Sequence, residues 1–376
     1  MTTWVKIGIL FIITQTLIQL VQEVPMEFLT INADYYCGID LHGRTMYTTV
    51  MDERGDIFFR RNMPNKFPLF FEFMKPFLPN LAVGVESTYN WYWLADGCQE
   101  HHISFYLGHA LYMKAVRGNK KKMDKIDSKT IANLMRTNLF PPAYAYPREM
   151  RATRDLLRRR SYYVALRAGA NTHIQSTFSQ QAILDIQGGD VKRKKSRRAL
   201  IERPENQDLA LSIECDLDLM DVTDAIIRKL EKQILQQARY HNHQALEILI
   251  TLPGVGNILA LTALYEIHEI GRFKSPQNFS SYCRVVKCNR ESNGKITDTG
   301  NQKIGNPYLK WVMTQIINKA QQQSPAIAKY FEKLKAKHGP RKARGIMAHK
   351  FAVTIYYMLK NNQAFDEEKF LQSKIK

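Results

Sequence analysis

The stretch Lys120-Lys121-Lys122-Met123-Asp124-Lys125-Ile126-Asp127 sets two acids three residues apart within a run of lysines. If the residues from Asp127 to Met135 begin a helix, Asp124 and Asp127 lie on one face of its first turn. Carboxylates at that position stabilise a helix, because the unpaired N–H groups of the first turn carry a partial positive charge. Two acids with this spacing and no other acid nearby ordinarily only stabilise the start of a helix. Whether Asp124 and Asp127 have a chemical role therefore depends on which other acids the fold brings close to them.

Two acids upstream accompany apolar stretches that are typical of buried strands. Asp40 lies in Cys37-Gly38-Ile39-Asp40-Leu41-His42, and Glu86 ends Leu81-Ala82-Val83-Gly84-Val85-Glu86. Gathering all four acids would be unfavourable, since two like charges about 4 Å apart cost roughly 4 kcal/mol at an effective dielectric near 20. A hard cation can hold such a cluster, and carboxylates, waters and phosphate oxygens are the ligands that Mg²⁺ prefers. The four acids are therefore a candidate magnesium site, provided that the fold brings them together.

The composition points to a folded protein with a polyanionic partner. The 376 residues suffice for two or three domains, and the formal net charge is +19. A charge of this size indicates a nucleic-acid partner, with an anionic membrane surface as the second possibility. The apolar run from Ile7 to Val21 is too short and too polar to span a membrane. Of the two possible partners we expect nucleic acid and no membrane. We expect residues 1–34 to be an extension, with the working protein beginning at Met26.

The order of expected elements in residues 35–140 indicates an α/β domain with a mixed sheet. The expected strands are Tyr35–Leu41, Thr45–Met51, Ile57–Arg60, Leu81–Val85 and Ile103–Leu107. The first three form a meander, and the later strands alternate with helices, one of which begins at His109. An acid on the first strand, another on the fourth and a pair opening a late helix is the pattern of ribonuclease H-like folds.

Residues 141–247 predict a long helical hairpin. One helix runs from Arg148 to about Gln187 and a second from Asp208 to about Ala245. The apolar spacing of the second helix suits either an antiparallel hairpin or a coiled coil between subunits. We expect the basic run Lys192–Arg198 to be a solvated loop that contacts phosphates without reading sequence.

Residues 248–360 predict a mostly helical domain, followed by a tail over residues 361–376. Its first turn, Leu252-Pro253-Gly254-Val255-Gly256, can hold a DNA phosphate on backbone N–H groups, as in helix-hairpin-helix modules, or can be a plain turn between helices. Both interpretations stay open from the sequence.

Glycine, asparagine and lysine surround Ser292, and a loop of this composition suits the approach of a phosphate. From its residue type alone, Ser292 is an ordinary polar turn residue. We expect nucleic-acid contacts at lysines before the acid pair, at arginines of the first long helix, and at the two turns of the last domain. The candidate residues are Lys120, Lys121, Lys122, Arg158, Arg159, Arg160, Gly254, Gly256, Lys295, Lys303 and Asn306.

An ordered set of segments resembles a known family, the insertion-sequence transposases whose N-terminal domain is like the Holliday-junction resolvase RuvC, also called bridge-RNA-guided recombinases. The segments are Cys37–His42, Gly84–Leu94, Gly108–Lys114, Asp124–Asp127, Glu149–Arg160, Leu252–Gly256, Ser292–Lys295 and Gly305–Trp311. They follow the family order from about residue 35 to residue 360. The chain departs from the family in residues 1–25 and at Ile296–Asp298, where a more basic stretch is expected.

The resemblance implies a site that the residues alone do not give. It implies a RuvC-like domain over residues 35–140 with a metal site of Asp40, Glu86, Asp124 and Asp127, and a transposase domain over residues 248–360 with Ser292 as nucleophile. In the family, the serine attacks a DNA phosphodiester and holds the broken strand covalently, and a structured non-coding RNA pairs with both donor and target DNA. The site is completed between subunits, which implies a dimer or tetramer. The expected location is the cytoplasm of a prokaryote, at the nucleoid.

Three functions compete on this basis. The first is a recombinase in which Ser292 and the acid-held Mg²⁺ cut and rejoin DNA under RNA guidance. The second is a resolvase-like nuclease in which water attacks and Ser292 is structural. The third is a basic scaffold that binds nucleic acid without catalysis, in which case binding weakens steeply with salt and ignores Mg²⁺. The ordered set of segments favours the recombinase.

Overall fold

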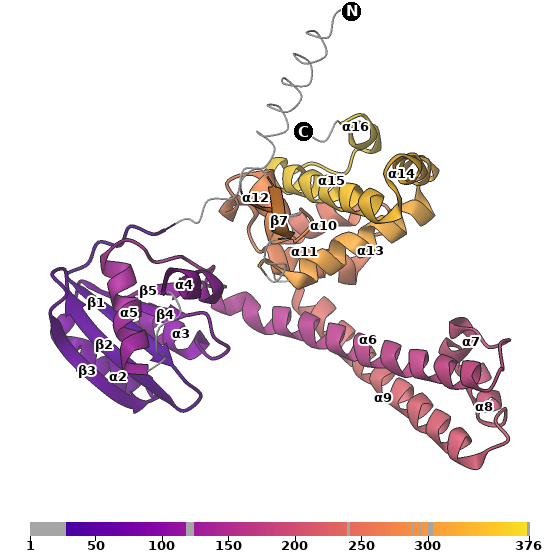
Figure 1. Ribbon diagram of the computed structural model, residues 1–376, viewed down its shortest axis with the longest axis horizontal. Coiled ribbons are helices and arrows are strands. Elements are labelled where there is room, and N and C mark those ends of the chain that lie inside the picture. The colour runs from indigo at the N-terminus through magenta and orange to yellow at the C-terminus, as the bar shows by residue number, and fades with distance from the viewer. Residues whose placement is uncertain are drawn as a thin grey trace, which may run out of the picture. The chain divides into compact units, whose positions relative to one another are not determined.

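A computed structural model describes residues 28–117, 124–238, 241–286, 289–292, 295–299 and 304–373 (Figure 1). The chain forms two compact units, Met1–Glu149 and Met150–Lys376. Each unit is described by itself below. Within the described residues, no helix is both long enough and apolar enough to cross a membrane.

The first unit is built on a five-stranded mixed sheet in the order β3-β2-β1-β4-β5. Its strands are β1 (Tyr35–Leu41), β2 (Thr45–Asp52), β3 (Ile57–Pro64), β4 (Leu81–Glu86) and β5 (Ser104–Gly108). β1, β2 and β3 are antiparallel neighbours, whereas β1, β4 and β5 run parallel. The expected α/β class with a mixed sheet is confirmed, and the strand order is consistent with the ribonuclease H-like pattern.

Two hydrophobic cores cover the two faces of this sheet. On one face, Cys37, Ile39 and Val83 pack with α2 (Phe67–Met74) and α3 (Tyr92–Glu100). On the other face, Tyr36 and Ala82 pack with α5 (Asp124–Arg136). The alternation follows from the period of two in a strand, which sends neighbouring side chains to opposite faces. The remaining elements of the unit are η1 (Lys75–Phe77) and α4 (Ala110–Arg117).

The second unit begins with an antiparallel hairpin of two long helices, α6 (Arg148–Gln180) and α9 (Gln207–Gln237). Contacts between them run in opposite directions along the chain, from Arg160–Glu231 through Arg167–Asp224 to His173–Asp216. The expected hairpin is therefore present within one chain. Both helices are shorter than expected: α6 ends at Gln180, and Asn242 begins a new helix by accepting a hydrogen bond from the N–H of Ala245.

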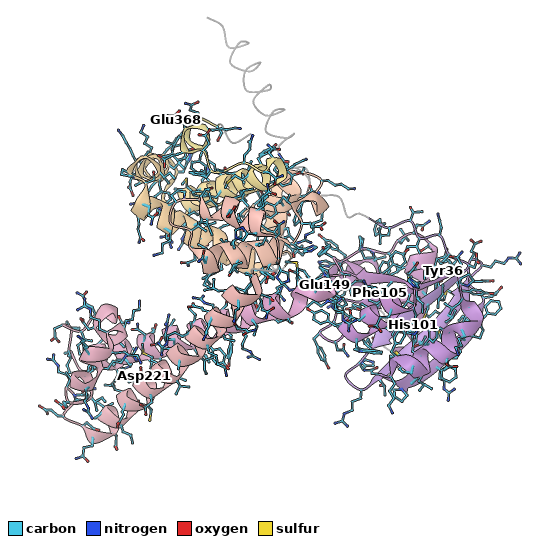
Figure 2. The ribbon with its side chains drawn as sticks, turned by 180° about the vertical axis from the view of Figure 1, so that it is seen from behind. Tyr36, His101, Phe105, Glu149, Asp221 and Glu368 are labelled. Carbon is cyan, nitrogen blue, oxygen red and sulfur yellow. The ribbon has the colours of Figure 1, made fainter. Side chains whose placement is uncertain are left out.

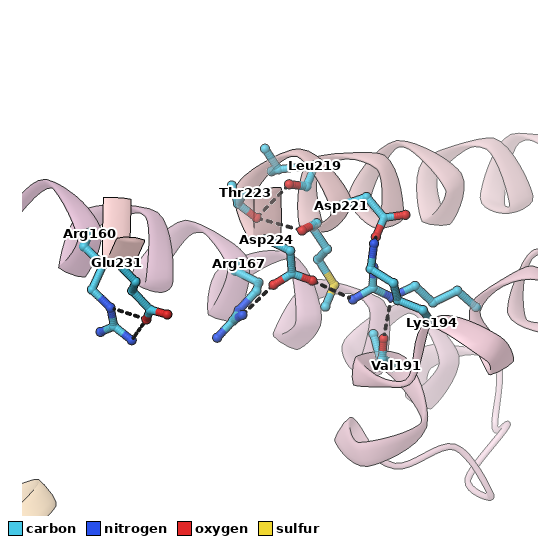
Figure 3. A network of polar contacts seen from close by, with 11 residues as sticks. Arg160, Arg167, Val191, Lys194, Leu219, Asp221, Thr223, Asp224 and Glu231 are labelled. Atoms are coloured by element: carbon cyan, nitrogen blue, oxygen red, sulfur yellow. Dashed lines mark hydrogen bonds and ion pairs between the residues drawn. The ribbon is translucent and has the colours of Figure 1, made fainter. Parts of the chain in front are cut away.

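The expectation of a loop over Lys192–Arg198 is wrong, whereas the expected exposure of its basic side chains holds for all of them except Arg197. This segment forms parts of α7 (Gly188–Lys192) and α8 (Lys194–Ile201), and Arg197 is buried. Its guanidinium donates to the carbonyl of Val191 and to the carboxylates of Asp221 and Asp224, and Asp224 also pairs with Arg167 on α6 (Figure 3). The acids of α9 neutralise the charge of Arg197, which packs on the hairpin, while the other basic side chains of the segment are exposed.

The rest of the second unit is a helical bundle around one core, which includes Leu261, Tyr265, Met313, Phe351 and Tyr356. Its helices are α10 (His243–Ile250), α11 (Asn257–Ile267), η3 (Ile270–Arg272), α12 (Pro276–Tyr282), α13 (Pro307–Gln323), α14 (Pro325–His338), α15 (Pro340–Asn361) and α16 (Glu367–Gln372). A two-stranded ribbon, β6 (Asn289–Ser292) and β7 (Lys295–Thr299), interrupts the helices. The expected helical character of the C-terminal region is confirmed. The predicted domain limits at residues 140, 247 and 360 stay predictions.

Candidate active site

Asp40 and Glu86 lie side by side at the carboxyl ends of two neighbouring strands, β1 and β4. The parallel pairing of β1 with β4 sets Ile39 opposite Val85, so the next residues on the two strands are the two acids. Ile39 and Val85 belong to the core that contains α2 and α3, and the alternation of a strand therefore turns both acids to the α5 face. Carboxyl ends of parallel strands are where α/β sheets commonly place functional side chains.

The first turn of α5 lies directly over β1, which brings Asp127 to the same face. A Cβ atom added to Gly38 would lie 2.2 Å from the carbonyl oxygen of Ser128 and 2.4 Å from the nitrogen of Ala132. Only glycine allows the helix backbone to come this close. The Ser128 hydroxyl is also 2.8 Å from that of Thr49 on β2, so the residue after Asp127 is fixed against two strands.

The loops after β1 and β4 are tied together beside Asp40. The side-chain N–H of Asn90 donates to the carbonyl of His42 at 2.6 Å, and that of Asn65 donates to the same carbonyl at 2.8 Å. The imidazole of His42 lies 3.4 Å from the carboxylate of Asp40, whose side chain is 19% exposed. Asp40 is thus held near the surface, where a phosphate or a hydrated cation can reach it.

His109 is a residue of this sheet edge that we did not assign to the site from sequence. It follows Gly108, which pairs with Glu86 across β4 and β5, and its ring stacks on Tyr112 with centroids 4.4 Å apart. Burial lowers the pKa of His109, and its buried Nδ1 has no hydrogen-bond partner among the described residues. The signal in the sequence was its place directly after a strand that neighbours an acid-bearing strand.

The donor set on this face fits a hard cation by its chemistry. Asp40, Glu86 and Asp127 offer carboxylate oxygens from two strands and one helix, and Asp124 is the first residue of α5. The side chain of Asp124 lies outside those that the structure describes. Among the described side chains, no three His, Cys, Asp or Glu residues lie close enough together to hold a metal ion. The four-acid metal site therefore stays a prediction.

In the second unit, two of the three candidate arginines on α6 have acidic partners inside the protein. Arg158 forms a two-pronged ion pair with Glu266 of α11, with N–O distances of 2.7 and 2.8 Å, and Glu266 is 2% exposed. Burial lowers the pKa of Arg158, but the hydrogen bond and charge of Glu266 outweigh it and raise the pKa overall. Arg160 pairs with Glu231 on α9. Arg159 is exposed and lies over the Tyr162 ring, so it is the best placed of the three for an outside phosphate.

Asn306 connects this buried ion pair to the segment that follows the ribbon. Its amide donates to the Glu266 carboxylate at 2.7 Å, and its side-chain oxygen accepts from the N–H groups of Tyr308 and Leu309 as the N-cap of α13. Gly305 has a φ of +95°, and an added Cβ would lie 2.6 Å from the carbonyl of Tyr282. The polypeptide is therefore anchored where it enters α13. The hydrogen bonds of buried Asn306 give this residue a structural role at the start of α13. A contact between Asn306 and nucleic acid stays a prediction.

Ser292 ends β6 and pairs with Lys295, the first residue of β7. The two residues therefore lie at adjacent ends of the two strands, and the role of Ser292 as a nucleophile stays a prediction. The side chains of both lie outside the described ones, and Lys120, Lys121, Lys122 and Lys303 lie outside the described residues altogether.

The Leu252–Gly256 turn shows different roles for its two glycines. Gly254 has a φ of +78°, and an added Cβ would lie 2.5 Å from the Cβ of Lys319 on α13, so packing requires glycine there. Gly256 has nothing within 4 Å of an added Cβ and stands at the start of α11. Of the two, Gly256 is the position open to a phosphate at a helix N-terminus.

Comparison with known families gives two matches, one to the first unit together with α6 and one within the second unit. A model of DEDD transposases of the IS110 type matches residues 37–182, which contain Asp40, Glu86, Asp124 and Asp127. A model described as the transposase IS116/IS110/IS902 family matches residues 246–332, which contain Ser292. No curated protein matched the chain in the same comparison.

Proposed function

Because the chain belongs to the IS116/IS110/IS902 family of transposases, we propose that it cuts and rejoins DNA through a covalent bond to Ser292, supported by a Mg²⁺ held by four acids. Membership of the family makes DNA the substrate and strand cleavage with transfer the activity. The serine, the metal and the guiding RNA are the proposed refinements. The observation that carries the proposal is the placement of Asp40, Glu86 and Asp127 on one face of the sheet, in the segment matched by the DEDD model.

The face of the sheet that carries Asp40, Glu86 and Asp127, called the acid face below, would provide the carboxylate ligands for a metal ion in phosphoryl transfer. Asp40 and Glu86 come from adjacent parallel strands, and Asp127 comes from the helix that lies on them. These side chains would hold Mg²⁺, which when bound polarises a phosphoryl oxygen and offsets the charge that develops on it. The acids repel a phosphate wherever no cation lies between them and it. The scissile phosphate would therefore bind only beside the cation that the acids hold.

Ser292 would form the covalent intermediate. Its hydroxyl oxygen attacks phosphorus, a bond from phosphorus to the serine oxygen forms, and the bond from phosphorus to the departing sugar oxygen breaks. The proton of the serine hydroxyl passes to a base or water, and the departing oxygen takes up a proton. The phosphodiester energy is kept in the serine ester, so a second DNA hydroxyl can reverse the step and join strands without ATP. The chain has no G-x-x-x-x-G-K-[ST] motif, which agrees with this.

The refinements of partner and assembly rest on charge and resemblance. A net charge of +19 suits binding of a structured non-coding RNA together with donor and target DNA. A homo-oligomer, dimer or tetramer, would allow the acid face of one copy to act with the serine of another. Both are part of the proposal.

A resolvase-like nuclease is the second candidate, favoured by the same match to the DEDD model. In that mechanism the acid-held metal activates water, and Ser292 has no chemical role. The two candidates share the acid face and differ only in the nucleophile.

Covalent trapping separates them. Labelled donor DNA, Mg²⁺ and the RNA from the element's non-coding end are incubated with the protein and run on a denaturing gel. We expect a slow-migrating labelled band with the wild type and with Ser179→Ala, a control serine exposed on α6, and no band with Ser292→Ala. Hydrolysed DNA without a band, unchanged in Ser292→Ala, would establish the nuclease instead.

A further inference from the structure

The second unit contains a cavity of about 780 Å³ that the proposed chemistry does not use. It lies where α15 faces the start of α12 and the segment that leads into α16. Its polar lining includes Gln277, His349, Tyr357, Asn361 and Gln363, and Val353 and Met358 contribute apolar surface. The volume and the mixture of apolar walls with a few polar groups are those of a small-molecule site.

We propose that this cavity binds one unpaired nucleotide of a single-stranded nucleic acid, with its base stacked on Tyr357. The proposal rests on the proposed function in so far as that function supplies a single-stranded partner. Such a partner arises in a guiding RNA and in DNA strands opened during exchange. The chemistry of the base is common to both sources.

Tyr357 is placed to act as a stacking platform. Its side chain is 49% exposed although it lines the cavity. Its ring meets that of buried Tyr356 edge-on, at 5.4 Å and 85°, and the Tyr356 hydroxyl donates to the carbonyl of Phe273. A fixed tyrosine with an open face is a common way to bind an unpaired base, since every base offers a π-face.

The remaining polar groups suit the edges of a base. Gln277, Asn361 and Gln363 each carry both a donor and an acceptor, which are the groups that base edges require. The buried Nδ1 of His349 has no hydrogen-bond partner in the described part of the chain, and burial lowers the pKa of this imidazole. A neutral histidine offers one donor and one acceptor, and an unpaired buried polar atom is costly unless a ligand or water completes it.

Charges of both signs line the cavity: the basic residues are Lys350 and Lys369, and the acid is Asp366. Buried Lys350 donates to the Tyr330 hydroxyl and to the carbonyl of Ser373, and its ammonium lies 5.0 Å from the centroid of the Phe370 ring. These contacts fix α16 as a wall of the cavity. Exposed Lys369 would attract a phosphate next to a bound nucleotide, against the opposing charge of Asp366.

Binding of short oligonucleotides tests the proposal. Single-stranded DNA and RNA oligomers of one sequence, each with a central 2-aminopurine, are titrated with wild type, Tyr357→Ala, Tyr357→Phe and Tyr162→Ala. Tyr162 is the control because its side chain is 51% exposed and lies on α6, outside the cavity. We expect about tenfold weaker binding and loss of fluorescence quenching in Tyr357→Ala alone, because stacking on an aromatic ring commonly contributes this much. Wild-type affinity and quenching in Tyr357→Ala would overturn the proposal.

A photochemical experiment on the wild type covers the case in which Tyr357→Ala does not fold. Oligomers carrying 4-thiouracil or 4-thiothymine are irradiated with the protein, and the attached peptide is identified by mass spectrometry. We expect attachment within residues 349–363. Attachment only outside the residues that line the cavity would contradict the proposal. The stronger of the RNA and DNA oligomers identifies the source of the nucleotide.

The outcome is separable from that of the proposed function. If the trapped DNA band is absent but Tyr357-dependent binding is present, the serine mechanism fails and the nucleotide site stands. If the band forms normally and Tyr357→Ala binds both oligomers like the wild type, the nucleotide site fails and the serine mechanism stands.

Discussion

The acid face of the sheet and the helical hairpin handle charge in opposite ways. On the sheet, Asp40, Glu86 and Asp127 are acids of one sign presented on one face. In the hairpin, Asp224 contacts both Arg167 and Arg197 (Figure 3), and Arg197 also contacts Asp221, which Figure 2 labels on the hairpin. Opposite charges in contact stabilise the fold, whereas acids presented on one face repel one another unless a basic group or a cation offsets their charge. Charged residues paired inside the protein are therefore assigned to stability, and acids gathered on one face are the candidates for a chemical role.

The largest expected effect is on catalysis by the acid face. Asp40→Asn and Asp127→Asn should each reduce DNA cleavage about 100-fold or more, because the carboxylates that would hold Mg²⁺ are lost. The midpoint of thermal unfolding should hold or rise, since repulsion between like charges falls. Cleavage of labelled donor DNA and calorimetry of the same preparations measure the two quantities.

Chelation gives the matching control for these acid variants. Removing divalent cations from the wild type should abolish cleavage and leave the variants at their residual rate. Cleavage by Asp127→Asn at the wild-type rate would show that the acids of the sheet, like those of the hairpin, are not needed for catalysis.

The reverse outcome is expected for the buried ion pair of the second unit. Glu266→Gln should lower the free energy of unfolding by about 3 kcal/mol, because it leaves Arg158 without its charged partner and weakens the hold on Asn306. The loss is measured by urea denaturation followed by circular dichroism. Glu231→Gln is the control, since the side chain of Glu231 is 31% exposed whereas that of Glu266 is 2% exposed, and its pair with Arg160 should contribute about 1 kcal/mol or less. Equal losses in the two variants would show that burial does not set the size of the effect.

The smallest expected effect concerns the glycine that seats α5 on the sheet. Gly38→Ala forces a Cβ against the backbone of Ser128 and Ala132, so we expect a loss of about 2 kcal/mol in unfolding free energy. Cleavage should also fall, because Asp127 moves with the helix. Gly345→Ala on α15 is the control: nothing lies within 4 Å of its added Cβ, and it should gain about 0.5–1 kcal/mol. A stable, active Gly38→Ala protein would contradict the close seating of α5.

The strands and helices whose residues follow a regular apolar pattern could be predicted from the sequence. The alternation around Asp40 and the apolar run before Glu86 predicted two strands, each with an acid at or near its end, and the structure has these strands as neighbours. The long helices were predicted with their limits off by several residues. Their ends depend on particular contacts, such as the cap that Asn242 provides to α10.

Partners far apart in the chain could not be predicted in the same way. Arg158 and Glu266 are separated by 108 residues, and a basic helix face gives no sign that one arginine will find a buried acid. Arg197 lies in a run of charges that is typical of solvated loops, and its burial depends on Asp221 and Asp224 of another helix. The role of Ser292 came from resemblance alone, because a serine near a glycine is ordinarily a turn residue.

Identification of the residue that carries the DNA tests the central claim most directly. The covalent adduct formed by the wild type with donor DNA is trimmed with nuclease, digested with protease and sequenced by mass spectrometry. The account predicts a nucleotide attached through phosphate to Ser292, and no attached peptide when Asp127→Asn replaces the wild type. Attachment to another residue, or efficient cleavage with no attached peptide at all, would contradict it.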